Sequence, residues 1–196
     1  MSLAIVFPGQ GSQSVGMMTA YGDHAAIRDT LAEASEALGF DLAGMMAEGP
    51  LETLNQTVNT QPAMLAAGVA VYRLWLARGG ARPALMAGHS LGEYTALTCA
   101  GALDFADALR LVRLRAEAMQ SAVPGGVGAM AAVLGLDDDA IRAVCAEAAQ
   151  GEVLEAVNYN SPGQVVMRHI NSRYNGLVEY LNNYQGSVAQ VLKEVA

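Results

Sequence analysis

Basic and aromatic residues are both scarce in this chain. Its 196 residues hold 11 Lys and Arg against 19 Asp and Glu, which gives a net charge of −8 and a pI near 4.7, and aromatics make up only 6%. Nucleic-acid-binding proteins ordinarily present a basic surface that releases counterions from phosphates, and anionic membranes attract the same kind of surface. We therefore expect neither nucleic acid nor a membrane among the partners.

Charge of either sign is also low. Charged residues make up 15% of the chain and hydrophobic residues 53%, a balance that excludes intrinsic disorder and a coiled coil. The longest apolar stretch, residues 63–72, is too short to cross a bilayer, and the first residues lack the positive charge of a signal peptide. We expect a folded protein of the cytoplasm.

Cysteine is rare. Cys99 and Cys145 have neither the spacing of a disulfide framework nor that of a metal site, and both lie in alanine-rich helical stretches. We expect two buried, apolar thiols and no bound metal.

Two short apolar runs, residues 3–7 and 84–87, each end in a glycine-containing loop, which is typical of buried parallel strands. Between and after them the spacing predicts helices, at residues 25–38, from Pro62 as first helical residue to Gly79, at 91–100, and at 105–120 with Asp104 as N-cap. Beyond a predicted hinge at Pro124 the pattern becomes strand, helix, strand, turn and strand, at 127–135, 137–149, 153–158, 160–163 and 164–166. This change predicts a small α+β subdomain.

Residues 88–92 read Gly-His-Ser-Leu-Gly, between a predicted strand and a predicted helix. A nucleophilic serine on a sharp strand-to-helix turn needs small flanking residues, and the helix N-terminus beside it offers N–H groups to a developing oxyanion. Ser90 is therefore the candidate nucleophile. The plainer alternative is a glycine-rich turn in which the serine only caps the helix.

The loop at residues 8–13, Pro-Gly-Gln-Gly-Ser-Gln, follows the other predicted strand. Loops at the carboxyl ends of neighbouring parallel strands meet in one crevice, so this loop is expected to bring a second N–H donor beside Ser90. A phosphate cradle is the alternative, although the loop lacks the Lys-Ser/Thr ending of a P-loop.

Arg115 is the third candidate. On the predicted helix Arg110, Arg113 and Glu117 form one polar stripe, and Arg115 lies about 200° away from Arg113 among small apolar residues. An arginine placed there needs an anionic partner. The sequence leaves two open, a structural carboxylate or the carboxylate of a substrate.

The general base is not identified, because none of the three histidines is a convincing partner for a serine nucleophile. His24 is expected to be solvated in a loop before a helix. His89 adjoins the serine on a turn where neighbouring side chains diverge, and His169 lies in the atypical C-terminal stretch. That stretch, from residue 167, holds the only lysine, Lys193, and is predicted to be helical over 174–195.

Seven segments, taken together and in this order, resemble the malonyl-CoA:acyl carrier protein transacylase family. They are residues 7–13 (Phe-Pro-Gly-Gln-Gly-Ser-Gln), 60–63 (Thr-Gln-Pro-Ala), 88–94 (Gly-His-Ser-Leu-Gly-Glu-Tyr), Arg115, 119–120 (Met-Gln), 128–130 (Gly-Ala-Met) and 158–164 (Asn-Tyr-Asn-Ser-Pro-Gly-Gln). The resemblance runs from residue 3 to about 166.

The resemblance implies an α/β fold: a parallel-sheet, α/β-hydrolase-like core at residues 1–123, and the start of a small ferredoxin-like subdomain at 124–166. It implies that Ser90 takes a malonyl group from coenzyme A and gives it to the phosphopantetheine thiol of acyl carrier protein. Gln10 and Leu91 would supply the backbone oxyanion hole and Arg115 would hold the malonyl carboxylate. Gln61, His89 and Asn160 would line the substrate site, with no permanently bound cofactor.

Residues 167–196 depart from the family, whose members are longer and supply a histidine base after this point. We therefore expect an incomplete fold with an exposed sheet edge, and weak activity or none from this chain alone. Two alternatives stay open, a serine hydrolase or thioesterase that uses the same turn, and a non-catalytic module. An exposed cluster of Arg73, Arg78 and Arg82 is a candidate docking patch for the acidic carrier protein, against the alternative of a merely solvated face.

Overall fold

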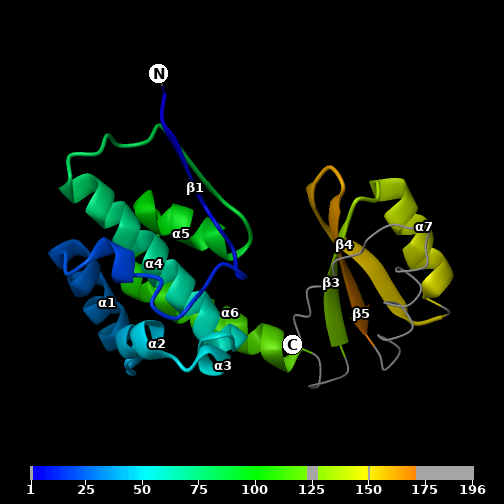
Figure 1. Cartoon of the computed structure of the whole chain (residues 1–196), viewed down its shortest axis with the longest axis horizontal. Helices are drawn as coiled ribbons and strands as arrows, with labels where there is room; N and C mark the ends of the chain where they lie inside the picture. The colour runs from blue at the N-terminus through cyan, green and yellow to red at the C-terminus, as the bar shows by residue number, and fades with distance from the viewer. Residues whose placement is uncertain (1, 123–127, 150, 171–196) are drawn as a thin grey trace. The chain divides into compact units, whose positions relative to one another are not determined.

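The computed structural model describes residues 2–122, 128–149 and 151–170. The chain divides between Met119 and Gln120 into two compact units. Helices and a parallel strand pair form the first unit, and an antiparallel sheet with one helix forms the second (Figure 1). This α/β organisation agrees with the sequence, although the predicted hinge at 124–126 and the helix predicted at 174–195 lie outside the described residues.

The first unit is built on two short parallel strands. β1 (Ala4–Phe7) pairs with β2 (Leu85–Gly88), so that Phe7 lies opposite Gly88 and both strands end at the same edge. The expected strands are therefore present. Their outer surface is open, since Val6 is 76% exposed and Leu85 is 70% exposed, which is unusual for parallel strands.

The remaining elements of this unit are helical. They are the 3-10 helix η1 (Thr19–Tyr21), α1 (Ala25–Leu38), α2 (Leu42–Glu48), α3 (Leu51–Leu54), α4 (Thr57–Ala77), α5 (Leu91–Cys99) and α6 (Phe105–Ser121). The sequence predicts α1, α5 and α6 closely, but α2 and α3 were missed. Asp41, whose carboxylate accepts from the amide of Gly44 at 2.8 Å, and Gly49 after the last turn were the cap signals for α2.

α4 lies at the centre of this unit and packs against both α1 and α5 (Figure 1). It is buried on nearly every side, and residues such as Leu65 on α4 share one core with Leu109 and Val112 of α6. The predicted start of this helix was wrong: α4 begins at Thr57, and Pro62 lies inside it. Side chains of Asn59 and Thr60 hold the earlier turn by donating to the carbonyls of Thr53 and Leu54.

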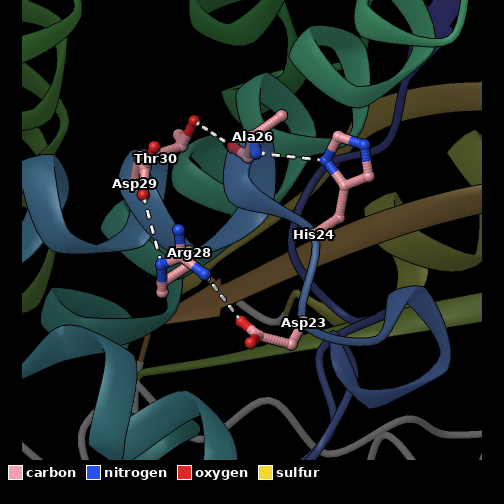
Figure 2. Close-up of polar contacts among 6 residues, drawn as sticks. All are labelled: Asp23, His24, Ala26, Arg28, Asp29 and Thr30. Atoms are coloured by element: carbon pink, nitrogen blue, oxygen red, sulfur yellow. Dashed lines mark hydrogen bonds and ion pairs between the residues drawn. The ribbon is translucent and has the colours of Figure 1, made fainter.

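Polar side chains cap the N-terminus of α1 (Figure 2). His24 lies directly before α1, as predicted, but it is half-buried rather than solvated, and its Nδ1 accepts from the amide of Ala26 at 3.1 Å. Arg28 lies between the carboxylates of Asp23 and Asp29, at 3.0 and 3.3 Å. At the other end, Gly39 closes α1 in the left-handed conformation.

The second unit contains β3 (Gly128–Leu134), α7 (Asp138–Ala148), β4 (Val153–Ser161) and β5 (Gln164–Ile170). The three strands form an antiparallel sheet in the order β3-β5-β4. The predicted elements are all present, but β4 continues to Ser161, so the turn is shorter than predicted. β5 continues past residue 166 to Ile170, and the rest of the atypical stretch lies outside the described residues.

The core of this second unit lies between α7 and its sheet. Ile141 and Val144 of α7 pack with Val133, Val165 and Met167 from the strands. Asp137 caps α7, as the sequence predicts, by accepting from the amide of Ala140 at 2.7 Å. Among the described residues of the whole chain, no helix is both long and apolar enough to cross a membrane.

Candidate active site

Ser90 occupies a strained turn between β2 and α5. Its backbone has φ 53° and ψ −108°, and it is the only non-glycine residue with positive φ among those described. A side chain in this region of backbone space costs about 1–3 kcal/mol, which the surrounding structure must supply. The sharp turn predicted from the Gly-His-Ser-Leu-Gly pattern is therefore present, and the Ser90 side chain lies exposed on it.

Both glycines of the pattern are required by close backbone contacts. A Cβ added at Gly88 would lie 1.9 Å from the carbonyl carbon of Gly92. One added at Gly92 would lie 2.2 Å from the carbonyl oxygen of Phe7. Both distances are far inside van der Waals contact. The turn therefore closes between β2 and α5 only because Gly88 has no side chain, and the end of β1 approaches α5 only because Gly92 has none.

The loop after β1 lies directly against this turn. The amide of His89 donates to the carbonyl of Phe7 at 3.2 Å, and a Cβ on Gly9 would lie 3.0 Å from the carbonyl oxygen of His89. Gln10 is the next residue in the loop. The structure thus brings the two predicted loops together at the same edge of the strand pair.

Gln10 and Leu91 are the two residues predicted to supply backbone N–H groups. Leu91 is the first residue of α5, where an amide has no partner within the helix. Within the described parts of the chain, neither N–H has a backbone or side-chain acceptor. Two unused donors therefore lie on the loop and the turn that meet at Ser90, as an oxyanion site requires.

Arg115, on α6, reaches the serine. Its Nη2 donates to Ser90 Oγ at 2.9 Å and its Nη1 donates to Gln61 Oε1 at 2.6 Å. The guanidinium carbon also lies 5.7 Å from the centre of the Tyr94 ring. No carboxylate among the described residues forms an ion pair with Arg115, so the alternative of a structural carboxylate partner was wrong for the part of the chain described here.

Gln61 joins these groups into one network. It is fully buried, and while its Oε1 accepts from Arg115, its Nε2 donates to Gln10 Oε1 at 3.2 Å and contacts Met119 Sδ at 3.3 Å. Four predicted site residues, Gln10, Gln61, Ser90 and Arg115, are thus linked from four different segments. Tyr94 was missed as a neighbour of the guanidinium, although its position one helical turn after Ser90 was a signal for it.

The four linked residues do not include His24, His89 or Asn160. His24 caps α1, and this removes it as a candidate base. Asn160 is an exposed residue of β4 in the second unit. The assignments of His89 and Asn160 to the substrate site stay predictions. The general base is still not identified.

The predicted basic cluster is only partly formed. Arg73 pairs with Glu33, donates to Thr30 Oγ1 at 3.1 Å and lies over the ring of Phe105, so its charge is already satisfied within the unit. Arg73 therefore has less charge available for docking than Arg78 and Arg82, which are exposed, and the docking role of the cluster stays a prediction.

The two thiols are reduced. Cys145 is buried and Cys99 is half-buried. Desolvation raises the pKa of Cys99 to about 12, against a smaller opposing effect of Arg73, and raises the pKa of Cys145 as well. The prediction of a buried thiol is confirmed for Cys145 but not for Cys99, which is only half-buried, and the raised pKa values keep both thiols protonated at neutral pH.

Comparison with known proteins identifies the family of this chain. A protein-family model described as acyl transferase domain matches residues 4–196. The malonyl CoA-acyl carrier protein transacylase of Escherichia coli (strain K12) is 59% identical over 165 residues, which cover 84% of this chain and 53% of that protein. The chain spans about half the length of the curated relatives it matches.

Solved structures of similar proteins share the fold. An acyl-carrier-protein S-malonyltransferase from Burkholderia pseudomallei 1710b matches with a TM-score of 0.92 and 56% identity, over 100% of this chain and 63% of that one. A malonyl-transacylase in complex with a type II PKS acyl-carrier protein matches with a TM-score of 0.91 and 48% identity, over 98% of this chain and 62% of that one.

Proposed function

The chain belongs to the acyl transferase domain family, and we propose that it accepts a malonyl group from malonyl-CoA on Ser90 and passes it to the phosphopantetheine thiol of acyl carrier protein. The observation that carries this proposal is the 2.9 Å hydrogen bond from Arg115 Nη2 to Ser90 Oγ. It places a fixed cation beside a hydroxyl on a strained turn. The similarity to transacylases supplies the substrate class.

In the proposed first step Ser90 Oγ attacks the thioester carbonyl carbon of malonyl-CoA. An Oγ–C bond forms, the C–S bond breaks, and the hydroxyl proton ends on the coenzyme A thiol. The N–H groups of Gln10 and Leu91 stabilise the negative charge that develops on the carbonyl oxygen, because neither has an acceptor among the described residues. The base that carries the proton is not assigned, and the second step reverses the first with the carrier thiol as acceptor.

Arg115 makes this site selective for a dicarboxylic acyl group. In a malonyl ester on Oγ the carboxylate carbon lies three bonds away, at most about 4 Å. A guanidinium that already reaches Oγ can therefore exchange that contact for the carboxylate, to which it can donate two parallel hydrogen bonds. Gln61 keeps the guanidinium in place from its other side, and an uncharged acyl group gains nothing from this arrangement.

We also propose a more specific fold for each unit and the cellular compartment of the reaction. The strained turn at the end of a parallel strand supports an α/β-hydrolase-like core. The strand-helix-strand-strand order of the second unit supports the first four elements of a ferredoxin-like subdomain. The acyl transfer would take place in the cytoplasm, with coenzyme A thioester as substrate and no resident cofactor.

The experiment follows the serine directly. The full chain is incubated with malonyl-CoA and weighed intact, with Ser90→Ala as control and acyl carrier protein added afterwards. We expect slow formation of a malonyl ester that persists in buffer, is absent from the control, and disappears when the carrier is added. Rapid release of malonate into water would identify a hydrolase instead. Failure of both malonyl-CoA and a phosphonate probe to modify Ser90 would identify a non-catalytic module.

A further inference from the structure

A proline inside α4 leaves one carbonyl of that helix without its usual donor. Pro62 is the sixth residue of the helix and has no N–H, so the carbonyl of Val58, four residues earlier, loses the hydrogen bond that a helix normally provides. The defect lies immediately after Gln61, the residue that holds the guanidinium of Arg115. A donor at this point therefore acts next to the candidate active site.

Arg113 supplies that donor from α6. Its Nη1 donates to the Val58 carbonyl and to Asn59 Oδ1, both at 3.2 Å. Its Nε donates to Glu117 at 2.8 Å, and its guanidinium lies 5.5 Å from the centre of the Phe40 ring. The sequence placed Arg113 on a polar stripe with Glu117. The pair is present, but the arginine also turns inward, and only 33% of its side chain is exposed.

The acceptor side of this contact is itself fixed. Asn59 is 9% exposed, and its Nδ2 donates to the carbonyl of Thr53 on α3 at 2.9 Å. Arg113 therefore binds a backbone carbonyl and a buried amide that cannot shift without breaking other bonds. The contact anchors α6 to a rigid part of α4.

Two arginines of α6 donate hydrogen bonds to side chains of α4 that are spaced alike, two positions apart on each helix. Arg113 bonds Asn59 and Arg115 bonds Gln61, and each pair is separated by 54 positions in the chain. The placement of α6 that satisfies the carbonyl at the proline defect is thus the placement that brings Arg115 to Gln61 and to Ser90. Both side chains leave the same turn of α6, so a displacement of α6 that breaks one contact would also move the other side chain.

We propose that Arg113 is a positioning residue, which fixes α6 at the Pro62 defect so that the Arg115 guanidinium faces Ser90. Through Arg115 it sets the preference for a malonyl group over an uncharged acyl group. This inference rests on the proposed function for its consequence in substrate choice. The positioning of the Arg115 guanidinium can be measured without any substrate.

The first test compares acyl loading of Ser90 in the full chain and in Arg113→Met. The ratio of malonyl to acetyl loading rates is expected to fall about tenfold or more, since small displacements of a positioning group cost that much. Arg113→Lys keeps one donor for the Val58 carbonyl and should lie between the two. Arg110→Met is the matched control, because it removes the same charge from an exposed pair with Asp107 on the same helix.

A second readout needs no activity. In chains labelled with ¹⁵N-arginine, the guanidinium signals of Arg115 are identified by their loss in Arg115→Lys. We expect them to move in Arg113→Met and to stay in place in Arg110→Met. If Arg113→Met does not fold, the same comparison is made with Arg113→Lys, for which a smaller movement is expected.

The outcomes separate the two proposals. No loading of the unchanged chain by malonyl-CoA counts against the proposed function, and the Arg115 signals then decide the positioning role alone. Equal losses of malonyl and acetyl loading, with an unchanged ratio, overturn the inference because they indicate a general loss of stability. Arg115 signals that do not move in Arg113→Met overturn it as well.

Discussion

Replacement of Ser90 by glycine should make the first unit more stable than replacement by alanine. Ser90 holds φ at 53°, where a Cβ is crowded and glycine is not. Both substitutions remove the hydroxyl that accepts from Arg115, so the loss of that hydrogen bond cancels in the comparison. What remains is the backbone strain of a residue with a side chain at this turn.

The expected difference follows from two opposing contributions. A left-handed backbone costs a residue with a side chain about 1–2 kcal/mol, and glycine avoids this cost. Glycine also adds freedom to the unfolded chain, which lowers stability by about 0.5–1 kcal/mol. We therefore expect the free energy of unfolding of Ser90→Gly to exceed that of Ser90→Ala by up to about 1.5 kcal/mol.

Urea unfolding followed by tryptophan fluorescence measures the stability of the first compact unit, to which Ser90 belongs. The chain has one tryptophan, Trp75, and it lies on α4 of the unit that contains Ser90. Ala32→Gly, at an exposed position inside α1, is the control and should lower stability by about 0.5–1 kcal/mol. If Ser90→Gly is less stable than Ser90→Ala by a similar amount, the turn carries no strain and the argument for a sharp nucleophile turn fails.

Two further predictions concern the same unit. Gly92→Ala should lower its free energy of unfolding by at least about 2 kcal/mol in the same urea experiment, because the new Cβ would lie 2.2 Å from the Phe7 carbonyl oxygen. A neutral effect would contradict the close approach of β1 to α5. Desolvation raises the pKa of Cys99 to about 12, so its thiol stays protonated in the folded chain at pH 8. Iodoacetamide should alkylate it at least about tenfold more slowly than in urea, as read by peptide mass, and equal rates would show an accessible thiolate.

The elements that the sequence predicts well are those whose signals are local. The periodicity over residues 25–38 and the glycine that follows give α1 its observed bounds, and Gly39 takes the left-handed conformation that such an end requires. Asp137 likewise predicts the start of α7. In each of these cases the residues that determine the end of the helix lie within a few positions of it.

The start of α4 could not be predicted in this way. Proline is common as the first residue of a helix, and this preference placed the start at Pro62, five residues too late. The earlier turn is stable because Asn59 and Thr60 bond carbonyls six positions back and Arg113 bonds the Val58 carbonyl from a distant helix. Such a contact has no signature in the local sequence.

Part of the site was predictable because, as for α1, its signals lie within a few positions in the sequence. The Gly-His-Ser-Leu-Gly pattern contains the turn, the glycines it needs and the start of the helix, so Ser90 and Leu91 follow from five residues. The partners of Arg115 did not follow, because Gln61 lies 54 positions away and Ser90 lies 25 positions away. Helical spacing showed that Arg115 needed a partner, but only the tertiary structure shows which one.

Three departures from local preference are connected through the contacts of Gln61, Arg115 and Ser90. Ser90 has a backbone that disfavours side chains, Pro62 interrupts a buried helix, and Arg115 places a cation where no described carboxylate pairs with it. The Val58 carbonyl left by Pro62 accepts from Arg113 of α6, and Arg115 of the same helix donates to Gln61 and to Ser90. Strained or incompletely paired groups persist in folded proteins where function requires them, and their convergence here is a physical reason, separate from any similarity to known enzymes, to place the chemistry at Ser90.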